Sequence, residues 1–208
     1  MLAELLGSKA RARVIAALLV APERRMHLRA LVRAAGGSIA SVQREVERLE
    51  DMGLVTSAID ESGKRQVTLV ADHPFAAPLE GMLAADPLAQ YEARSRQMPH
   101  LRPEISAVLG GWVDAIVRRF DPIEIVLFGS QAHGTADAAS DVDLLVVLPE
   151  VRDEVETSVA LMEALWPRTV GVDVFAVDPA GLEQAMGRRS SVIRDAVEGG
   201  VVLYGRAV

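Results

Sequence analysis

The sequence predicts two folded domains of different class. The first is a mainly helical domain that ends in a β-hairpin, and the second is an α/β (α+β) domain with a mixed sheet flanked by helices. Three observations predict this division. Apolar residues recur at helical spacing up to residue 54 and then give way to two short strands. Four prolines interrupt residues 73–100. Beyond them, helical patterns alternate with short apolar runs to the end of the chain.

The composition indicates an ordinary globular protein. Half of the 208 residues are hydrophobic and a quarter are charged, which excludes a disordered or fibrous chain. Cysteine is absent, so disulfides and thiolate metal sites are excluded. The longest apolar run, residues 14–21, is too short to span a membrane, and residues 1–13 lack the order of a signal peptide. We therefore expect a cytoplasmic protein with no membrane association.

The net charge of -7 is unevenly distributed between the two predicted domains. Residues 1–72 carry 11 Lys and Arg against 9 Asp and Glu, whereas residues 73–208 carry 11 against 20. A mildly basic first part is compatible with contacts to a phosphate backbone. An acidic second part is better suited to holding a divalent cation than to lying along DNA. The asymmetry predicts two different tasks.

The first domain has the pattern of a helix-turn-helix with a wing. Ser8 is placed to cap a helix that runs to a break at residues 21–22, and a second helix beginning near Leu28 ends at two glycines. Ser38 is placed to cap a third helix, and two helices joined by a glycine turn are typical of a helix-turn-helix. Residues 55–59 and 66–70 read as strands around a glycine-containing loop, which predicts a hairpin.

This order of elements, together with Val46-Glu47-Arg48-Leu49-Glu50-Asp51-Met52-Gly53-Leu54-Val55, resembles the ArsR-like winged-helix regulators over residues 8 to about 74. The resemblance implies a DNA-binding domain at residues 1–74. The candidate major-groove residues lie away from the apolar stripe of the third helix, and they are Gln43, Arg44 and Arg48. Lys64 and Arg65 on the wing are candidates for phosphate contacts. The alternative is that these are solvated charges on a domain that serves protein contacts only.

Residues 75–100 are expected to form a connector with one or two short helices. Its apolar residues Leu79, Met82, Leu83 and Leu88 are expected to pack on one domain or across a homodimer. The sequence leaves that choice open.

The second domain, at residues 101–208, shows alternating helix and strand patterns. A turn is expected at Gly129-Ser130. The expected helices are residues 105–120, 153–165 and 182–198, and the expected strands are residues 123–128, 142–148, 169–177 and 201–204.

Three aspartates on the predicted strands point to metal-dependent chemistry. Alternate residues of a strand share a face, so Asp141 and Asp143 should project together as two hard oxygen ligands. Carboxylates so close repel each other unless a divalent cation lies between them. Asp173 lies in an otherwise apolar strand and reaches the same ion if the two strands are neighbours. Gly129 and Ser130 offer backbone N–H groups and a hydroxyl to a polyphosphate.

The segments Phe128-Gly129-Ser130-Gln131-Ala132-His133-Gly134 and Ser140-Asp141-Val142-Asp143-Leu144 resemble the minimal nucleotidyltransferase (MNT) branch of the DNA polymerase β superfamily. The resemblance runs from about residue 105 to the end. It implies that Gly129 and Ser130, with Gly134 beside them, hold the triphosphate of ATP. It also implies that Asp141 and Asp143 bind Mg²⁺ (or Mn²⁺), and that Asp173 completes a second metal site and helps to activate the acceptor hydroxyl.

One departure from the family pattern concerns charge near the phosphates. Many members of the branch have arginine where this chain has Gln131 and His133. A protonated His133 replaces one of these charges in part. The departure bears on the rate of reaction more than on the fold.

The resemblance implies transfer of AMP from ATP to an acceptor hydroxyl. Enzymes resembling this domain often act as antitoxins that adenylylate a HEPN-type toxin, and a fused DNA-binding domain suits a self-regulating operon. The alternative is a transcription regulator whose nucleotidyltransferase-like domain only binds or senses nucleotide. A third reading, an enzyme that modifies an antibiotic, would normally need a further substrate-binding domain.

Overall fold

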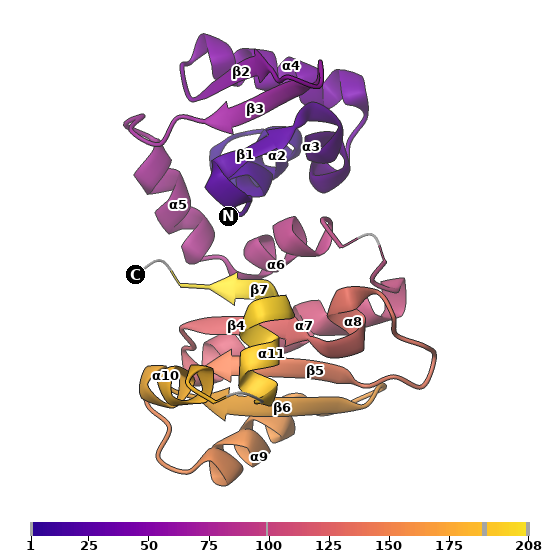
Figure 1. The fold of residues 1–208 in the computed structure, drawn as a ribbon. Coiled ribbons are helices and arrows are strands. Elements are labelled where there is room, and N and C mark those ends of the chain that lie inside the picture. The colour runs from indigo at the N-terminus through magenta and orange to yellow at the C-terminus, as the bar shows by residue number, and fades with distance from the viewer. Residues whose placement is uncertain (1, 99, 189–190, 207–208) are drawn as a thin grey trace. The chain divides into compact units, whose positions relative to one another are not determined.

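A computed structural model describes residues 2–98, 100–188 and 191–206. The chain divides into two compact units, which meet in sequence between residues 99 and 100 (Figure 1). Each unit is described by itself. Among the described residues, no helix combines the length and apolar character needed to cross a membrane.

The three predicted helices of the first unit are present, and two of them begin at the predicted caps. Ser8 accepts a hydrogen bond from the Arg11 amide and caps α2 (Lys9–Leu19), which follows the short α1 (Leu2–Leu5). The next helix, α3 (Leu28–Ala35), ends at Gly36, whose φ of 63° places it in the left-handed region. Ser38 then accepts a hydrogen bond from the Ser41 amide and caps α4 (Ile39–Asp51). The helix-turn-helix is therefore α3 and α4.

A three-stranded sheet completes the wing, with strand order β1-β3-β2. The hairpin of β2 (Val55–Ile59) and β3 (Arg65–Leu69) confirms the prediction, although β3 begins one residue earlier. The sequence did not predict β1 (Arg25–His27), which follows the short 3-10 helix η1 (Pro22–Arg24). Three residues are too few to show an alternating pattern, and β1 forms because β3 offers it an open edge.

The expected connector is folded and belongs to the first unit. It forms α5 (Ala76–Ala84) and α6 (Pro87–Ser95). Pro78 and Pro87 do not break these helices because each lies in a first turn, where no intrahelical amide bond is lost. Leu79 and Leu83 join the hydrophobic core of α2, α3 and α4, so they pack within this unit.

The second unit contains a four-stranded mixed sheet, as predicted, with strand order β6-β5-β4-β7. The strands are β4 (Glu124–Phe128), β5 (Val142–Val147), β6 (Val172–Val177) and β7 (Val201–Gly205). The β5–β6 pair is parallel, and β4 is antiparallel to both β5 and β7. The two aspartate-bearing strands are neighbours, which was the condition for Asp173 to reach the site of Asp141 and Asp143.

Helices cover both faces of this sheet. Val126, Leu145 and Val177 pack on residues of α10 (Pro179–Met186) and α11 (Val192–Gly199). In Figure 1, α11 crosses in front of the sheet, whereas α7 (Pro103–Phe120) lies behind it and contacts α9 (Glu154–Ala164). Strand alternation thus divides the core into two layers.

Two expectations about local structure were wrong. Gly129 and Ser130 open a short helix, α8 (Gly129–His133), rather than a plain turn. The single helix expected at residues 182–198 is two helices, with Gly187 ending α10 and Ser191 preceding α11. The expected helix also included residues 189–190, which lie outside the described residues. The apolar residues continue at helical spacing across residues 182–198, so the sequence pattern did not show the break. The helix ends at Gly187 because glycine has the lowest helix propensity after proline.

Candidate functional site

The three predicted aspartates gather where β5 and β6 begin. Asp143 on β5 is directly opposite Asp173 on β6 in the parallel register. Asp141 lies just before β5, where the Val142 amide donates to the Gly171 carbonyl at 3.0 Å. Asp143 is half-buried, and the other two aspartates are exposed. The structure thus brings all three carboxylates to one edge of the sheet.

Two glycines leave space for these carboxylates. A Cβ atom on Gly129 would collide with the Asp143 carboxylate, and one on Gly171 would collide with the Asp141 carboxylate. Gly129 also has a φ of 68°, which side-chain-bearing residues rarely adopt. Gly129 is therefore required both by its backbone conformation and by the approach of Asp143, and Gly171 makes the same room for Asp141.

Like charges raise the energy of the ionised cluster. The pKa of Asp143 is raised above its usual value, first by partial burial and then by the negative charges of Asp173 and Asp141. Among the described residues, no Lys, Arg or His forms an ion pair with any of the three. The site therefore carries concentrated negative charge that no Lys, Arg or His of the described part of the chain neutralises.

The chemistry of this donor set fits a hard divalent cation such as Mg²⁺, which prefers carboxylate oxygens. No group of three or more carboxylate or imidazole side chains forms a finished metal cage within the described part of the chain. Asp141 is turned toward Gly171 and Asp143 toward Gly129. A cation held by both would draw these side chains together.

The predicted phosphate-binding residues lie beside Asp143. Phe128 is directly opposite Asp143 in the antiparallel register, so α8 starts next to that carboxylate. Ser130 is half-buried, and its carbonyl accepts from the Thr135 amide at 3.1 Å. Gly134 ends α8 with a φ of 72°, as the prediction of a tight turn requires. The segment from Gly129 to Gly134 is thus a compact turn of helix beside the acidic cluster.

Gln131 has a role that the sequence did not predict. Its side chain is only 2% exposed, and its Nε2 donates to the Ser140 carbonyl at 3.2 Å. Ser140 immediately precedes Asp141. Gln131 therefore links α8 to the segment that precedes Asp141, and it does not project toward a phosphate site.

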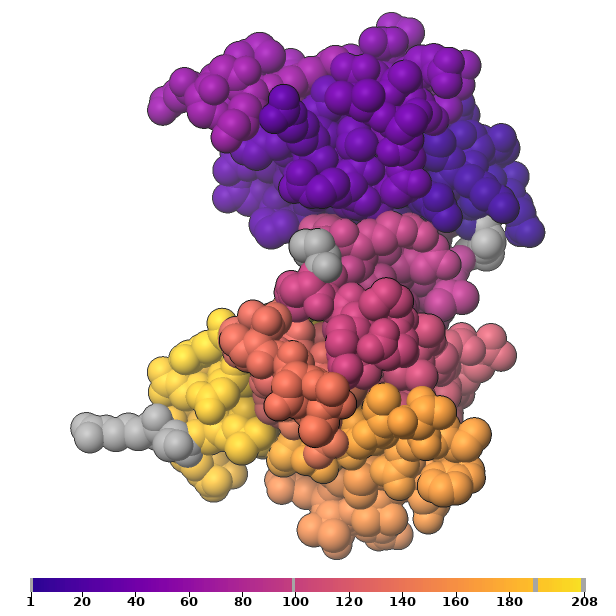
Figure 2. Space-filling view, turned by 90° about the vertical axis from the view of Figure 1, so that its right-hand side faces the viewer, coloured from indigo at the N-terminus to yellow at the C-terminus, as the bar shows by residue number. Residues whose placement is uncertain are grey.

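A cavity of about 650 Å³ opens next to Asp143 and Gly129. Phe128 and Phe175 form part of its wall, with ring centroids 5.7 Å apart. In Figure 2, the salmon surface around residues 130 to 140 meets the yellow carboxy-terminal surface, in keeping with the contact between α8 and α11. The cavity has the size of a small-molecule site.

The sequence analysis did not identify Asp195 and Glu198 as residues of this cavity, and it considered His133 only as a substitute for a family arginine. His133 Nδ1 lies 2.7 Å from the Gly129 carbonyl, which can only accept, so this nitrogen donates. A Cβ on Gly199 would lie 2.9 Å from His133 Nε2. Asp195 and Glu198 of α11 also line the cavity. No spacing rule links α11 to α8, and only the fold brings them together.

The predicted DNA-contacting residues differ in exposure and in whether they form ion pairs within the protein. Arg44 and Lys64 are exposed, and no ion pair joins either of them to another described residue. Arg48 pairs with Glu45 at 3.0 Å, and Arg65 pairs with Glu50 at 2.8 Å. Gln43 is half-buried.

Glu45 explains part of this pattern. It is 6% exposed although it is charged, and its carboxylate accepts from Arg11 and Arg48, each at 3.0 Å. Buried carboxylates are retained only where such partners exist. Glu45 therefore joins α2 to α4, and Arg48 is committed in part to this intramolecular pair.

Comparison with known proteins found a family match within the second unit. Residues 112–202 match the family model described as a nucleotidyltransferase domain. A search of curated proteins found no match.

Solved structures similar to the chain include two bacterial regulators. A MarR-family transcriptional regulator from Silicibacter pomeroyi is 20% identical, covers 56% of this chain and 76% of its own, and gives a TM-score of 0.35. AbsC, a MarR-family regulator from Streptomyces coelicolor, is 18% identical, covers 57% and 79% respectively, and also gives 0.35.

Proposed function

Given that residues 112–202 carry a nucleotidyltransferase domain, we propose that the second unit transfers AMP from ATP to an acceptor hydroxyl, in a reaction that requires Mg²⁺. The acceptor hydroxyl belongs to a partner protein such as a HEPN-type toxin. The first unit binds DNA and regulates transcription. The chain is thus a nucleotidyltransferase fused to a regulator.

The observation that carries this proposal is the unneutralised carboxylate cluster beside the start of α8. The pKa of Asp143 is raised by partial burial and then by the negative charges of Asp173 and Asp141, and Gly129 leaves room for its carboxylate. Structural carboxylates normally have cationic or amide partners. A cluster without them is costly in the free protein and becomes favourable when a cation and a polyphosphate arrive.

Each residue has a task in the reaction. Asp141 and Asp143 would hold Mg²⁺, which would neutralise the charge that develops on the phosphates. The amides and hydroxyl of Gly129 and Ser130 hold the triphosphate, and Gly134 shapes the turn. Asp173 orients the acceptor hydroxyl and accepts its proton as the oxygen bonds to the α-phosphorus. The bond from the α-phosphorus to the bridging oxygen breaks, and pyrophosphate leaves.

The 650 Å³ cavity beside Asp143 gives the adenosine part of ATP a place to bind. Its aromatic wall, Phe128 and Phe175, offers apolar surface to a nucleobase. His133 replaces the family arginine at a position that lines this cavity, with Nδ1 fixed by the Gly129 carbonyl.

A stripe of exposed apolar residues supports a protein acceptor. Val155 and Val159 of α9 are 75% and 45% exposed, and Trp166 just beyond the helix is 73% exposed. Val155 and Val159 are one helical turn apart on α9, and Trp166 follows the end of the helix by two residues. Exposed apolar side chains gathered in this way favour contact with another protein. Trp166 precedes β6, the strand that carries Asp173.

Transfer of label tests the enzymatic part of the proposal. The full chain is incubated with ATP labelled at the α-phosphate, Mg²⁺ and a co-expressed HEPN-type protein encoded beside it. Wild type should label a side-chain hydroxyl of the partner. Asp173→Asn should bind ATP nearly as well but transfer at least about a hundredfold more slowly, a loss of about 3 kcal/mol in transition-state stabilisation.

The control is Glu183→Gln, which removes an exposed carboxylate of α10 outside the cluster and should transfer at the wild-type rate. If wild type binds Mg-ATP but labels no partner, RNA or aminoglycoside, the domain is a nucleotide sensor. A fully active Asp173→Asn would show that the third carboxylate has been given the wrong role.

A further inference from the structure

Helix α11 lines part of the cavity beside Asp143. The residues that it contributes are Val192, Asp195, Glu198 and Gly199. Successive turns of the helix supply them, so they share one face. Gly129 and Asp143 line the same cavity, where the proposed triphosphate and Mg²⁺ would bind. This face of α11 therefore borders the proposed nucleotide.

The carboxy-terminal end of this face lies beside the proposed phosphate-binding turn. A Cβ atom on Gly199 would lie 2.9 Å from His133 Nε2, and His133 Nδ1 donates to the Gly129 carbonyl at 2.7 Å. An α-helix rises about 1.5 Å per residue, so Asp195 lies roughly 6 Å and Val192 roughly 10 Å along the axis from Gly199. Phosphate, ribose and base follow one another in a nucleotide. A nucleotide that extends from Gly129 along α11 therefore places its ribose near Asp195 and its base near Val192.

The two acidic residues of this face differ in whether a partner holds them. Arg194 Nε donates to the Glu198 carboxylate at 2.8 Å. The same guanidinium donates through Nη1 to the carbonyls of Met186 and Arg188. Asp195 is exposed, and no ion pair or side-chain hydrogen bond joins its carboxylate to another described residue. Asp195 is therefore the carboxylate of this face that is open to a ligand.

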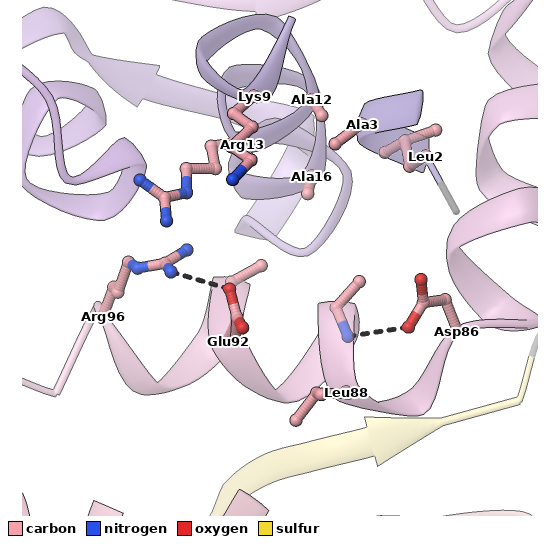
Figure 3. Close-up of a pocket in the computed structure, with 12 residues that line it drawn as sticks. Leu2, Ala3, Lys9, Ala12, Arg13, Ala16, Asp86, Leu88, Glu92 and Arg96 are labelled. Atoms are coloured by element: carbon pink, nitrogen blue, oxygen red, sulfur yellow. Dashed lines mark hydrogen bonds and ion pairs between the residues drawn. The ribbon is translucent and has the colours of Figure 1, made fainter. Parts of the chain in front are cut away.

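A second cavity, within the first unit, shows the usual state of carboxylates that line a cavity. It has a volume of about 300 Å³ and lies between α2 and α6 (Figure 3). Its Asp86 carboxylate caps α6 by accepting from the Ala89 amide at 3.1 Å. Its Glu92 carboxylate accepts from Arg96 at 2.7 Å, and Figure 3 shows both interactions. Asp195 has no such interaction with the described residues, so its acceptor oxygens are left for a ligand.

The chemistry of an ionised carboxylate restricts which part of a nucleotide Asp195 can bind. A carboxylate only accepts hydrogen bonds, and it repels phosphates, so its ligand must offer donors. The ribose 2′- and 3′-hydroxyls are two donors on neighbouring carbons, and the two carboxylate oxygens can accept from both. Acidic side chains bind ribose hydroxyls in this way in dinucleotide-binding folds. The adenine amino group is the other donor, but it lies farther from the phosphates, toward the end of α11 that carries the apolar Val192.

We propose that Asp195 accepts hydrogen bonds from the ribose hydroxyls of the bound nucleotide, so that the site selects ribonucleoside over deoxyribonucleoside triphosphates. This inference rests on the proposed nucleotide site and adds to it a residue that determines specificity. The negative charge of Asp195 lowers affinity for the phosphates of either kind of nucleotide. Discrimination between the two sugars, rather than affinity itself, is therefore the property that Asp195 controls.

Calorimetry of nucleotide binding to the full chain with Mg²⁺ tests this inference. Wild type should bind 2′-deoxy-ATP about tenfold more weakly than ATP, because one hydrogen bond to a charged group is lost. Asp195→Ala should bind the two with affinities equal within about twofold, and the ratio cancels the general effect of removing a charge near the phosphates. Glu183→Ala, which removes an exposed carboxylate of α10 outside the cavity, should keep the wild-type ratio.

A third nucleotide separates binding of the sugar from binding of the base. Purine riboside triphosphate lacks only the adenine amino group, so its loss of affinity relative to ATP should be the same in wild type and in Asp195→Ala. If Asp195→Ala instead abolishes discrimination against this analogue, Asp195 binds the base and the proposal is overturned. Equal affinity of wild type for ATP and 2′-deoxy-ATP would overturn the proposal and leave the nucleotide site intact. A wild type that binds neither nucleotide would overturn the nucleotide site, and with it this inference.

Discussion

Two charged clusters, one in each unit, differ in how their charges are balanced. In the first unit, Glu45 is buried but accepts from Arg11 and Arg48, and Arg65 of the wing is held by Glu50. In the second unit, Asp141, Asp143 and Asp173 gather without a cationic partner among the described residues. The first arrangement satisfies its charges within the fold, whereas the second leaves them to be satisfied from outside.

This difference separates structural charges from functional ones. Removing one member of a satisfied pair leaves its partner without compensation, so stability falls. Removing one member of a repelling cluster relieves the repulsion, so stability rises while ligand binding is lost. The sign of the stability change therefore distinguishes the two kinds of site.

The largest expected effect is at Gly129. Gly129→Ala forces a Cβ onto the Asp143 carboxylate and strains a residue with positive φ, so we expect a loss of about 2 kcal/mol or more in the free energy of unfolding. Gly111→Ala, in α7 where a Cβ meets nothing within 4 Å, should instead gain up to about 1 kcal/mol. Denaturant unfolding of both variants checks this. Equal stability of the two would mean that Asp143 does not approach Gly129.

Glu45→Ala should lower the free energy of unfolding by about 1 to 3 kcal/mol, because Arg11 keeps its partly buried position without its carboxylate partner. Glu47→Ala, an exposed neighbour on the same helix, should change it by less than about 0.5 kcal/mol. Thermal and urea denaturation measure both. If Glu45→Ala has the same free energy of unfolding as wild type, this charge network does not stabilise the first unit.

Arg44→Ala should weaken binding to operator DNA by about 1 to 2 kcal/mol and flatten sequence preference, with stability unchanged, because Arg44 is exposed and unpaired among the described residues. Lys64→Ala should weaken binding to all DNA sequences alike. It should also reduce by about one the slope of log K against log salt concentration. Fluorescence anisotropy over a salt series measures both quantities. If no promoter fragment binds at low salt, the winged helix is a protein-contact module.

The smallest effect tests the repulsion itself. The pKa of Asp143 is raised in the folded state, so its ionised form destabilises the fold at neutral pH, and this cost disappears as pH falls through that raised pKa toward 3.8. Asp143→Asn should therefore raise the Tm of the metal-free protein at pH 7 by roughly 1 to 3 °C, a small shift because solvent screens a partly exposed group. The gain should shrink at acidic pH. A lower Tm at pH 7 would mean that Asp143 is a satisfied structural residue.

The sequence predicted most of the fold because its helices carry local signals. Ser8 and Ser38 cap the predicted helices, and Gly36 ends the second of them in the left-handed conformation. Strand alternation also predicted that Asp141 and Asp143 lie close together, and both lie where β5 begins. These features depend on neighbours within a few residues, so they are readable without a structure.

What escaped prediction depends on contacts distant in the chain. The short strand β1 exists only because β3 pairs with it. Gln131 was read as a missing charge near the phosphates, but it is buried and holds the Ser140 carbonyl. Asp195 and Glu198 reach the nucleotide-sized cavity only because α11 packs against α8. Such residues carry no local pattern that marks them.

Calorimetry of ATP binding to the full chain tests the central claim most directly, because it needs no acceptor. ATP should bind in the presence of Mg²⁺ and at least about a hundredfold more weakly with excess chelator, a difference of about 2.7 kcal/mol. The double variant Asp141→Asn with Asp143→Asn should lose the Mg²⁺-dependent binding while remaining folded. Undiminished binding of Mg-ATP to that variant would contradict the assignment of the carboxylate cluster as the nucleotide-bound metal site.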